Sequence, residues 1–386
     1  MDFQWSAQAE QMLVTSFGLS RAEVDVVRHL MSGLSLRQVA AAAGKSEHTV
    51  RNQLKSVLSK TGAPGQVELI RLVAFLVNEE LRARDGTAHM HALRHDVRTA
   101  AGGRKLQIFH AGAPNGTPLI FLHGMLDATA SLQFFSDRMA AENYRVYAPM
   151  RPGFGLSDPV IRPETMMDVI TDQIVELIER EKLRKPLILG HLAGGIYGHI
   201  LAHRLRDRVA GLVAVSSGAP VTKLGDISSM NARVRVMAYT ARFTPALLPA
   251  VLRAGIAMID SDDIDAFMDA QFPVGTVDRT AIQRLGLAPL IQQGYRLSVK
   301  QGAVGFAGDS YWALRDWGQL AQGELAPTIY LHGAHDTVNK AYRIAESMVN
   351  WPEIQVRICQ DVGQMLFYER PDLVFAALRE VAARRA

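Results

Sequence analysis

Apolar and polar positions follow two different periods along this chain, and the period changes near residues 79–96. Before this segment, apolar residues recur every three to four positions, as on one face of an amphipathic helix. After it, short apolar runs typical of buried strands alternate with amphipathic helical stretches. The pattern predicts a helical domain over residues 1–78, a polar linker over 79–96 and an α/β domain over 97–386, and 386 residues exceed the usual size of one core.

Three helices of the first domain carry explicit start signals. Ser20 with Glu23, and Ser35 with Gln38, have the spacing of capping boxes, in which each side chain satisfies a backbone N–H group of the first turn. Ser46 is expected to cap the third helix. Helical spacing then gives this third helix one apolar face, made of Val50, Leu54, Val57 and Leu58.

The opposite face of the third helix is basic and rich in amides. It carries His48, Thr49, Arg51, Asn52, Gln53, Lys55 and Lys60. Two short helices joined by a turn that contains glycine, with such a face on the second helix, are the arrangement that enters the major groove of DNA. From periodicity alone, a merely solvated polar face stays open as the alternative.

Residues 20–73 resemble the LuxR-type helix-turn-helix over their whole length, including the segments SEHTVRNQL and GQVEL. By this resemblance the positions at the DNA are Ser46, His48, Thr49, Arg51, Asn52 and Lys55. Arg51, Asn52 and Lys55 take the base-facing positions, because arginine and lysine can reach guanine edges and asparagine can reach adenine. The resemblance therefore implies double-stranded DNA as a partner.

A fourth helix, predicted over about residues 66–77, is apolar on two sides. One side can pack on its own domain, whereas the other needs a partner. In the LuxR family this helix commonly mediates dimerisation, so the resemblance implies a homodimer that binds a near-palindromic DNA site. The alternative is that the second side packs on the large domain.

The large domain shows five short apolar runs separated by helical stretches. They are PLIFLHG, YRVYAPM, KPLILG, VAGLVAVSS and PTIYLHG. Such an alternation predicts a mostly parallel sheet with helices on both faces. The long segment over about residues 221–308 is expected to form a helical lid over the strand ends.

Nearly all of residues 95–386 resemble the α/β-hydrolase superfamily. The resemblance rests on His123-Gly124 after a strand, on RPGFGLS at residues 151–157 and on ERPDLV at residues 369–374, in this order. It implies the α/β-hydrolase fold for this domain.

The catalytic positions of that fold hold unusual residues. The nucleophile of the family lies at a strand-to-helix turn of pattern G-x-S-x-G, and the corresponding GHLAG at residues 190–194 has Leu192 in place of the serine. Asp336 takes the acid position, whereas Gln364 takes the position of the histidine. Leucine has no nucleophilic atom, and glutamine cannot accept and return a proton near neutral pH, although its amide could hydrogen-bond Asp336. We therefore expect no catalysis by the standard route.

Other residues near the strand ends could in principle replace the missing groups. The candidates are His123, His191, His332, Ser216 and Ser217. None of them comes with a paired nucleophile and base that the sequence reveals, so no catalytic residue is assigned.

What remains is a pocket that could bind a small, largely apolar molecule without consuming it. Its expected lining is His123, Met125, His191, Leu192, Ala193, Gln364 and Met365, with backbone N–H groups of Met125 and Ala193 pointing into it. The lid contributes candidate apolar contacts, although such residues are more often plain core. These are Met230, Met237, Met258, Met268, Phe243 and Phe267.

Composition adds few constraints. The formal net charge is +4, which neither demands nor excludes nucleic acid, and the single cysteine, Cys359, excludes an intramolecular disulfide and a thiolate metal cluster. The first ten residues lack a signal-peptide pattern, and no uncharged apolar stretch is long enough to span a bilayer. We expect a cytoplasmic protein without a membrane partner, metal or cofactor.

The combined pattern favours a transcription regulator that responds to a small ligand. Two alternatives stay open: the large domain could serve only as a dimerisation or protein-docking scaffold, or it could be an active hydrolase with a non-standard site.

Overall fold

The computed structural model describes residues 10, 13, 14, 17–61, 63, 65, 66, 68–70, 73, 93–228, 230, 232–244 and 264–384. The chain divides into two compact units, residues 1–91 and 92–386. Each unit has a hydrophobic core of its own.

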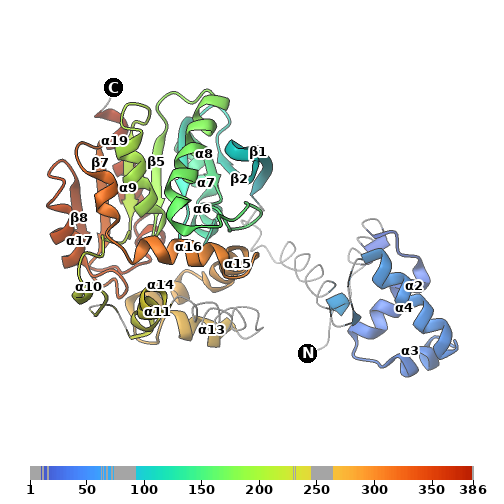
Figure 1. Cartoon of the computed structure of the whole chain (residues 1–386). Helices are drawn as coiled ribbons and strands as arrows, with labels where there is room; N and C mark the ends of the chain where they lie inside the picture. The colour runs from blue at the N-terminus through green and yellow to red at the C-terminus, as the bar shows by residue number, and fades with distance from the viewer. Residues whose placement is uncertain are drawn as a thin grey trace. The chain divides into compact units, whose positions relative to one another are not determined.

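The N-terminal unit is helical, as its amphipathic pattern predicts (Figure 1). Its described helices are α2 (Arg21–Met31), α3 (Leu36–Ala42) and α4 (Glu47–Thr61). Both predicted capping boxes are formed, from Ser20 and from Ser35, and the hydroxyl of Ser46 accepts a hydrogen bond from the backbone N–H of Thr49 at 3.1 Å. Gly33 and Gly44 end α2 and α3 in the left-handed conformation that glycine adopts without strain.

The core of this unit comes from the apolar faces of the three helices. On α4, the predicted stripe residues Val50, Leu54 and Val57 are buried. Two residues of the predicted fourth helix, Leu69 and Val73, are also buried in this core. Most of that helix, and with it the predicted dimerisation face, lies outside the described residues.

The C-terminal unit is built on an eight-stranded sheet with the order β1-β2-β4-β3-β5-β6-β7-β8. The strands are β1 (Arg94–Ala100), β2 (Arg104–Gly112), β3 (Thr117–Leu122), β4 (Tyr144–Pro149), β5 (Leu187–His191), β6 (Gly211–Val215), β7 (Thr328–Gly333) and β8 (Gln355–Cys359). β1 and β2 run antiparallel to their neighbours, and the other pairs are parallel. The expected mostly parallel sheet is therefore confirmed.

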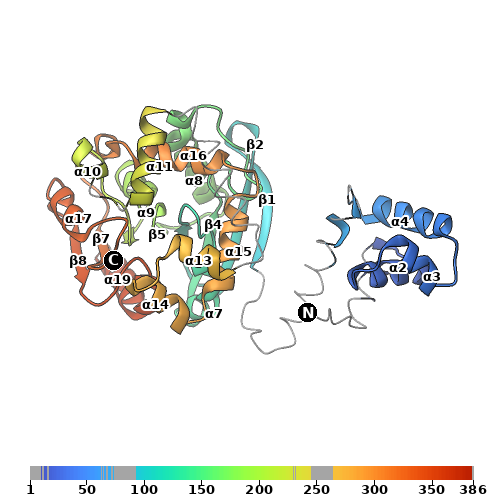
Figure 2. The same cartoon turned by 90° about the horizontal axis from the view of Figure 1, so that it is seen from below.

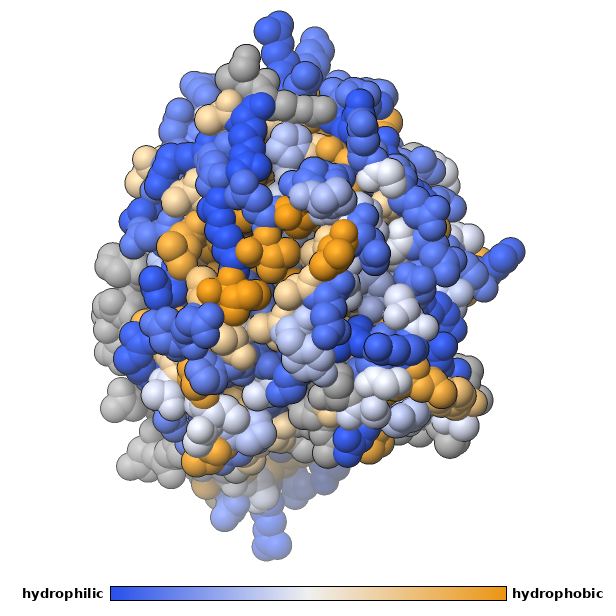
Figure 3. Space-filling model, turned by 90° about the vertical axis from the view of Figure 1, so that its left-hand side faces the viewer, coloured by the Kyte–Doolittle hydropathy of each residue, from blue (hydrophilic) through white to orange (hydrophobic). Residues whose placement is uncertain are grey.

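The two strands at the edges of the sheet, β1 and β8, carry no strong apolar run. β1 begins at Arg94, inside the segment expected as a linker up to residue 96, and its half-buried residues Asp96 and Arg98 alternate with exposed ones. β8 is the edge strand on the other side, and four of its five residues are only half-buried. Figure 3 shows the face on this side, where apolar atoms lie exposed among charged side chains. Strands with partial burial give a weak hydrophobic pattern, which is why the sequence did not reveal them.

Helices cover both faces of the sheet. α9 contacts β5 and β6, whereas α7 contacts β2 and β4 and α19 contacts β5 to β7 on the opposite face (Figure 2). The helical segments outside the lid are η1 (Ala101–Gly103), α6 (Ala130–Phe134), α7 (Ser136–Ala141), η2 (Pro163–Thr165), α8 (Met166–Arg180), α9 (Gly194–Arg204), α17 (Ala341–Met348), α18 (Leu366–Glu369) and α19 (Pro371–Ala383).

The segment between β6 and β7 is helical, as expected for the lid, and gathers below the sheet in Figure 1. Its described helices are α10 (Leu224–Ser228), α11 (Ala232–Phe243), α13 (Ile264–Gln271), α14 (Val277–Arg284), α15 (Ala288–Ser298), α16 (Val304–Ala313) and η4 (Trp317–Ala321). α16 runs through the expected lid boundary at residue 308, so the helical insertion is longer than predicted. Among the described residues, no helix combines the length and apolar character needed to cross a bilayer.

Candidate functional site

The turn between β5 and α9 places Leu192 at the carboxyl end of the sheet. Leu192 has φ of +52°, a conformation that side chains with a Cβ rarely adopt, and its N–H donates to the carbonyl of Val215 at 2.9 Å. The two glycines of the turn leave no space for a side chain. A Cβ on Gly194 would lie 1.9 Å from the carbonyl oxygen of Leu122, and one on Gly190 would lie 2.6 Å from the Cα of Gly195. The sharp turn is therefore fully formed around a hydrocarbon side chain.

A cavity of about 560 Å³ opens above this turn, within the range that small-molecule sites occupy. Loops after β3, β5, β7 and β8 form its floor, and the lid helices form its roof. Floor residues include Met125, Asp127, Leu192, Ala193, Thr337, Asn339, Gln364 and Met365, and roof residues include Met230, Met237, Phe272, Tyr295, Phe306 and Ser310.

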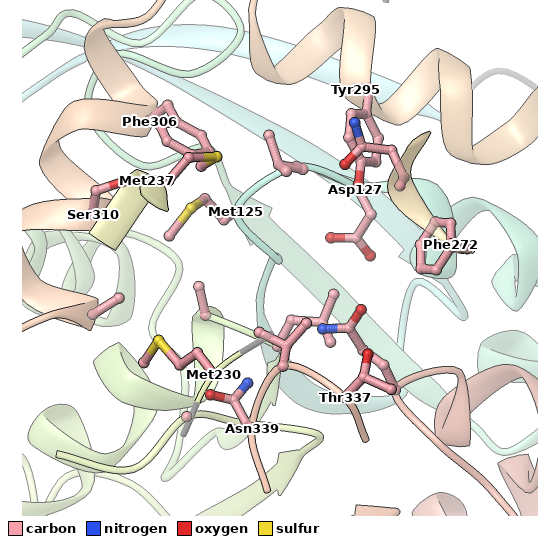
Figure 4. A pocket seen from close by; sticks show the side chains of 18 of the residues that line it. Met125, Asp127, Met230, Met237, Phe272, Tyr295, Phe306, Ser310, Thr337 and Asn339 are labelled. Atoms are coloured by element: carbon pink, nitrogen blue, oxygen red, sulfur yellow. The ribbon is translucent and has the colours of Figure 1, made fainter. Parts of the chain in front are cut away.

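The carboxylate of Asp127 and the side chains of Met125 and Met237 lie on different sides of the cavity (Figure 4). Met125, Met237 and Phe306 gather on one side together with Ser310, and Met230 lies close to the same end. Asp127 and Thr337 lie towards the other side together with Phe272 and Tyr295, and the carboxylate of Asp127 projects into the open space. The site can therefore accept a molecule that is apolar at one end and polar at the other.

Two backbone N–H groups at the floor have no acceptor. Among the described residues, neither the N–H of Met125 nor that of Ala193 donates a hydrogen bond, and both residues line the cavity. These are the two groups that the sequence led us to expect there. An anion or carbonyl oxygen in the cavity could accept from them.

The acid position is occupied by a deeply buried carboxyl group. Oδ1 of Asp336 accepts from the backbone N–H groups of Val338 and Asn339 at 2.7 and 2.8 Å, whereas Oδ2 lies 3.5 Å from Nε2 of His332. Burial raises the pKa of Asp336 to about 7, although these backbone donors oppose the shift. The amide of Gln364 makes no hydrogen bond to Asp336 among the described residues and lines the cavity instead.

A second carboxyl group, which the sequence did not suggest, reaches the same loop from the lid. Asp278 of α14 is 4% exposed, and its Oδ1 accepts from the N–H of Met365 at 2.9 Å. A Cβ on Gly363 would lie 2.4 Å from this oxygen, so glycine is needed for the approach. Burial raises the pKa of Asp278 to about 7, and the nearby charge of Asp336 adds to the shift against the opposing donor at Met365. The lid is thus joined to the loop of residues 363–365 by a buried carboxyl group.

His191 does not form a catalytic relay with its polar neighbours. Its Nδ1 lies 3.1 Å from Oγ of Ser131 and also 3.1 Å from Oδ2 of Asp127. A nucleophile and an orienting acid must contact opposite ring nitrogens of the histidine between them, whereas here both candidates approach the same nitrogen. The other nitrogen, Nε2, is buried without a hydrogen-bond partner in the described structure.

His123 has a structural role. Its Nε2 accepts from the N–H of Arg151 at 3.1 Å, which leaves Nδ1 to donate to the carbonyl of Gly124 at 2.7 Å. Burial, with the charge of Arg151 second, lowers the pKa of His123 well below its ordinary value. The neutral ring therefore connects the backbone at Gly124 to the backbone at Arg151 through two hydrogen bonds.

Arg151 also connects the floor loop to the lid. Its guanidinium pairs with the carboxylate of Asp309 on α16 and donates to the carbonyls of His123 and Gly124. The hydroxyl of Tyr197 donates to the same carboxylate at 2.7 Å. Arg151 and Asp309 are both buried, so removing either side chain would leave the charge of the other buried without a partner.

The expected pocket lining is partly corrected. Met125, Leu192, Ala193, Gln364 and Met365 line the cavity, but His123 and His191 do not, because hydrogen bonds and ring packing hold them behind its wall. His332, Ser216 and Ser217 are also buried away from it. Of the lid candidates, Met230 and Met237 line it, Phe267 and Met268 are core, Phe243 is 56% exposed, and Met258 lies outside the described residues.

On the N-terminal unit, the outer face of α4 is exposed. Arg51 is paired with Glu47 at 2.7 Å, and Asn52 lies 3.2 Å from His48. Lys55 is exposed and has no polar partner within the described part of the chain.

Lys60 is the exception on this helix. Its Nζ lies 2.7 Å from Glu23 and donates to the carbonyl of Gly18, so it belongs to the domain's own packing and not to the free polar face. Although burial opposes it, hydrogen bonds from Lys60, Ser56 and Ser20 hold the pKa of Glu23 at about 2.

Comparison with protein families identifies both units. The model of the Alpha/beta hydrolase family matches residues 119–377. The model of bacterial regulatory proteins of the luxR family matches residues 18–73.

Individual relatives resemble the large unit. The chain is 31% identical over 116 residues to the dihydrolipoyllysine-residue acetyltransferase component of the acetoin cleaving system of Pseudomonas putida, covering 30% of this chain and only 31% of that protein. It is 23% identical over 279 residues to the AB hydrolase superfamily protein YfhM of Bacillus subtilis, covering 70% of this chain and 92% of that protein.

Solved structures share the fold of the large unit at low identity. An epoxide hydrolase from Vigna radiata has a TM-score of 0.57 at 16% identity, covering 76% of this chain and 99% of that one. An esterase from Rhodococcus sp. has a TM-score of 0.55 at 19% identity, with the same coverage. Identities this low carry the fold and no activity.

The two raised carboxyl pKa values predict a pH dependence of stability. Asp278 and Asp336 bind protons more tightly in the folded chain, where their pKa is about 7, than in the unfolded chain, where it is about 4. Their contribution to the free energy of unfolding is therefore greatest below pH 4 and decreases as the pH rises to about 7. Asp278→Asn keeps an acceptor for the N–H of Met365 and removes one titrating group, so its melting temperature should fall less between pH 5 and pH 8.

The control is Asp172→Asn, which changes an exposed carboxylate on α8. It should melt in parallel with the unaltered protein at every pH, as followed by calorimetry. If Asp278→Asn shows the same decrease as the control, Asp278 does not titrate in this range.

Proposed function

Because the chain belongs to the alpha/beta hydrolase family and carries a luxR-family regulatory domain, we propose that it is a transcription regulator whose hydrolase-fold domain binds a small, largely apolar ligand without hydrolysing it. The single observation that carries the proposal is the open cavity of about 560 Å³ around Leu192. A molecule can enter this space, yet the side chain at its centre has no atom that could attack it.

The proposed absence of hydrolysis follows from the residues at the nucleophile and histidine positions, Leu192 and Gln364. Covalent hydrolysis requires a nucleophile and a base within hydrogen-bond reach, and Leu192 and Gln364 supply neither. In subtilisin, loss of the serine or the histidine alone lowers turnover roughly a millionfold. The geometry around His191 supports the same conclusion, because Ser131 and Asp127 contact one nitrogen and cannot relay a proton through the ring.

DNA binding is assigned to the exposed face of α4. We propose that Arg51, Asn52 and Lys55 read bases in the major groove, and that Ser46, His48 and Thr49 lie near phosphates at the start of the helix. Arg51 can leave Glu47 at little cost, because an exposed ion pair contributes at most about 1 kcal/mol.

The two activities are linked in this proposal. A ligand changes DNA binding only if it binds one state of the regulator more tightly than the other. A homodimer on a near-palindromic site, acting in the cytoplasm, is the form in which luxR-type domains would meet DNA. This dimer is part of the proposal.

A second function keeps the DNA-binding domain and uses the hydrolase fold only as a scaffold. Such a scaffold has no need of an open cavity, and the space bounded by Met125, Met237 and Phe306 therefore favours ligand binding. An active hydrolase would need a nucleophile and base elsewhere in the cavity.

Substitutions on α4 test the DNA assignment. The preferred operator would first be selected from a pool of random duplexes by the full-length protein. Lys55→Ala and Arg51→Ala should then each weaken binding to that operator by about 1–3 kcal/mol and relax the base preference, as measured by fluorescence anisotropy. Lys60→Ala is the matched control, since Lys60 pairs with Glu23: it should lower thermal stability and leave the base preference unchanged. Unchanged affinity and preference in both test variants would remove α4 as the reading helix.

Filling the cavity tests ligand binding. The fluorescent apolar probe N-phenyl-1-naphthylamine should bind the full-length protein, and Ala313→Phe, which adds a ring at the cavity wall, should weaken its binding at least tenfold. Ala345→Phe makes the same change at an exposed position on α17 and should have no effect. Absence of probe binding, or equal binding in Ala313→Phe, would contradict the proposed function.

A further inference from the structure

The polar end of the cavity contains a buried carboxylate whose hydrogen-bonding capacity is unused. Asp127 is only 6% exposed, lines the cavity, and projects into it in Figure 4. Neither of its carboxylate oxygens accepts a hydrogen bond from any described residue. A buried carboxylate without donors is costly, because it has lost the water that would otherwise solvate it.

The neighbours of Asp127 hold it in place without satisfying it. Gly124 leaves the space that the carboxylate occupies, since a Cβ there would lie 1.8 Å from Oδ1. Nδ1 of His191 is 3.1 Å from Oδ2, but the geometry of this contact is not that of a hydrogen bond, and the same nitrogen is engaged with Ser131. The carboxylate is therefore positioned, and its acceptor sites remain available.

The phenol of Tyr368 adds a constraint on the same end. Burial, with the charge of Asp127 second, raises the pKa of Tyr368 well above its ordinary value. A phenol is neutral near pH 7 even at its ordinary pKa, and the shift keeps Tyr368 neutral at higher pH as well, so it adds no negative charge to the wall. Among the described residues that line the cavity, Asp127 is the only acidic group that a donor meets.

We infer that the ligand of this cavity is an amphipathic molecule with an apolar tail and a head group that carries an N–H or O–H donor, and that Asp127 accepts the hydrogen bond from that donor. The tail lies among Met125, Met230, Met237 and Phe306, at the opposite end of the space. Thioether side chains adapt to apolar shapes, so this end sets few limits on the tail. This inference rests on the proposed ligand-binding function and adds the chemistry of the head group.

The head-group preference can be measured with three probes of similar size. 1-Octanol and octylamine each carry a donor, whereas heptyl methyl ether is an isomer of octanol without one. Each would compete with N-phenyl-1-naphthylamine for the full-length protein. The two donors should bind at least tenfold more tightly than the ether, because a site built around a buried acceptor discriminates against a molecule that leaves it unpaired.

Substitution of Asp127 assigns the preference to this residue. In Asp127→Ala the three probes should bind within about threefold of one another. Asp127→Asn retains an acceptor oxygen without the charge, so octanol should keep its advantage over the ether while octylamine loses at least tenfold relative to octanol. If Asp127→Ala fails to fold, the loss of octylamine binding relative to octanol in Asp127→Asn is sufficient to test the role of Asp127. Asp172→Asn is the control and should behave as the unaltered protein.

Two results would overturn the inference while leaving ligand binding intact. The ether could compete as well as the alcohol, or the donor preference could survive in Asp127→Ala; Asp127 would then serve only to hold His191 and its loop. Failure of N-phenyl-1-naphthylamine itself to bind would instead overturn the proposed function, and the inference with it.

Discussion

The turn between β5 and α9 imposes the constraint on which the rest of the large unit depends. It reverses the chain so sharply that residue 192 must take a positive φ and that Gly194 must lie against the carbonyl of Leu122 in the neighbouring strand β3. A residue with a Cβ at position 194 would separate α9 from the sheet. The turn therefore keeps its geometry whether or not position 192 carries a reactive atom. The structural requirement of the turn thus lies at the glycines and is independent of the chemical character of residue 192.

The same independence extends to the surrounding cavity. The floor loops are held by groups other than Leu192, Asp336 and Gln364. Arg151 binds the carbonyls of His123 and Gly124 and reaches Asp309 of the lid, and Asp278 binds the N–H of Met365. These contacts keep the cavity open by joining the lid to the sheet at two points. The result is an open, mostly apolar space that also contains a carboxylate, Asp127, which accepts no hydrogen bond from the described residues.

Features that depend on residues close together in the sequence could be predicted, whereas contacts between residues far apart in the sequence could not. The capping serines, the periodic face of α4, and Leu192 in its glycine-flanked turn depend on neighbours a few residues away, so they could be read directly. Lys60 was misjudged because its partner Glu23 lies 37 residues away. Asp278 and Asp309 likewise bind Met365 and Arg151, which lie far away in the sequence. His123 and His191 do not line the cavity because they hydrogen-bond to other groups, and these contacts are visible only in the folded structure. The edge strands β1 and β8 escaped notice because half-buried strands lack a strong apolar run.

The central claim is that the cavity recognises a molecule without reacting with it, and turnover measures this most directly. The full-length protein would be incubated with p-nitrophenyl butyrate, an activated ester small enough for a cavity of about 560 Å³, and with a fluorophosphonate that labels reactive serines. The account predicts release of p-nitrophenol at the rate of buffer alone and no gain in protein mass. Saturable release that stops when the cavity is filled by Ala313→Phe, or a covalent adduct mapped to a residue lining it, would contradict the account.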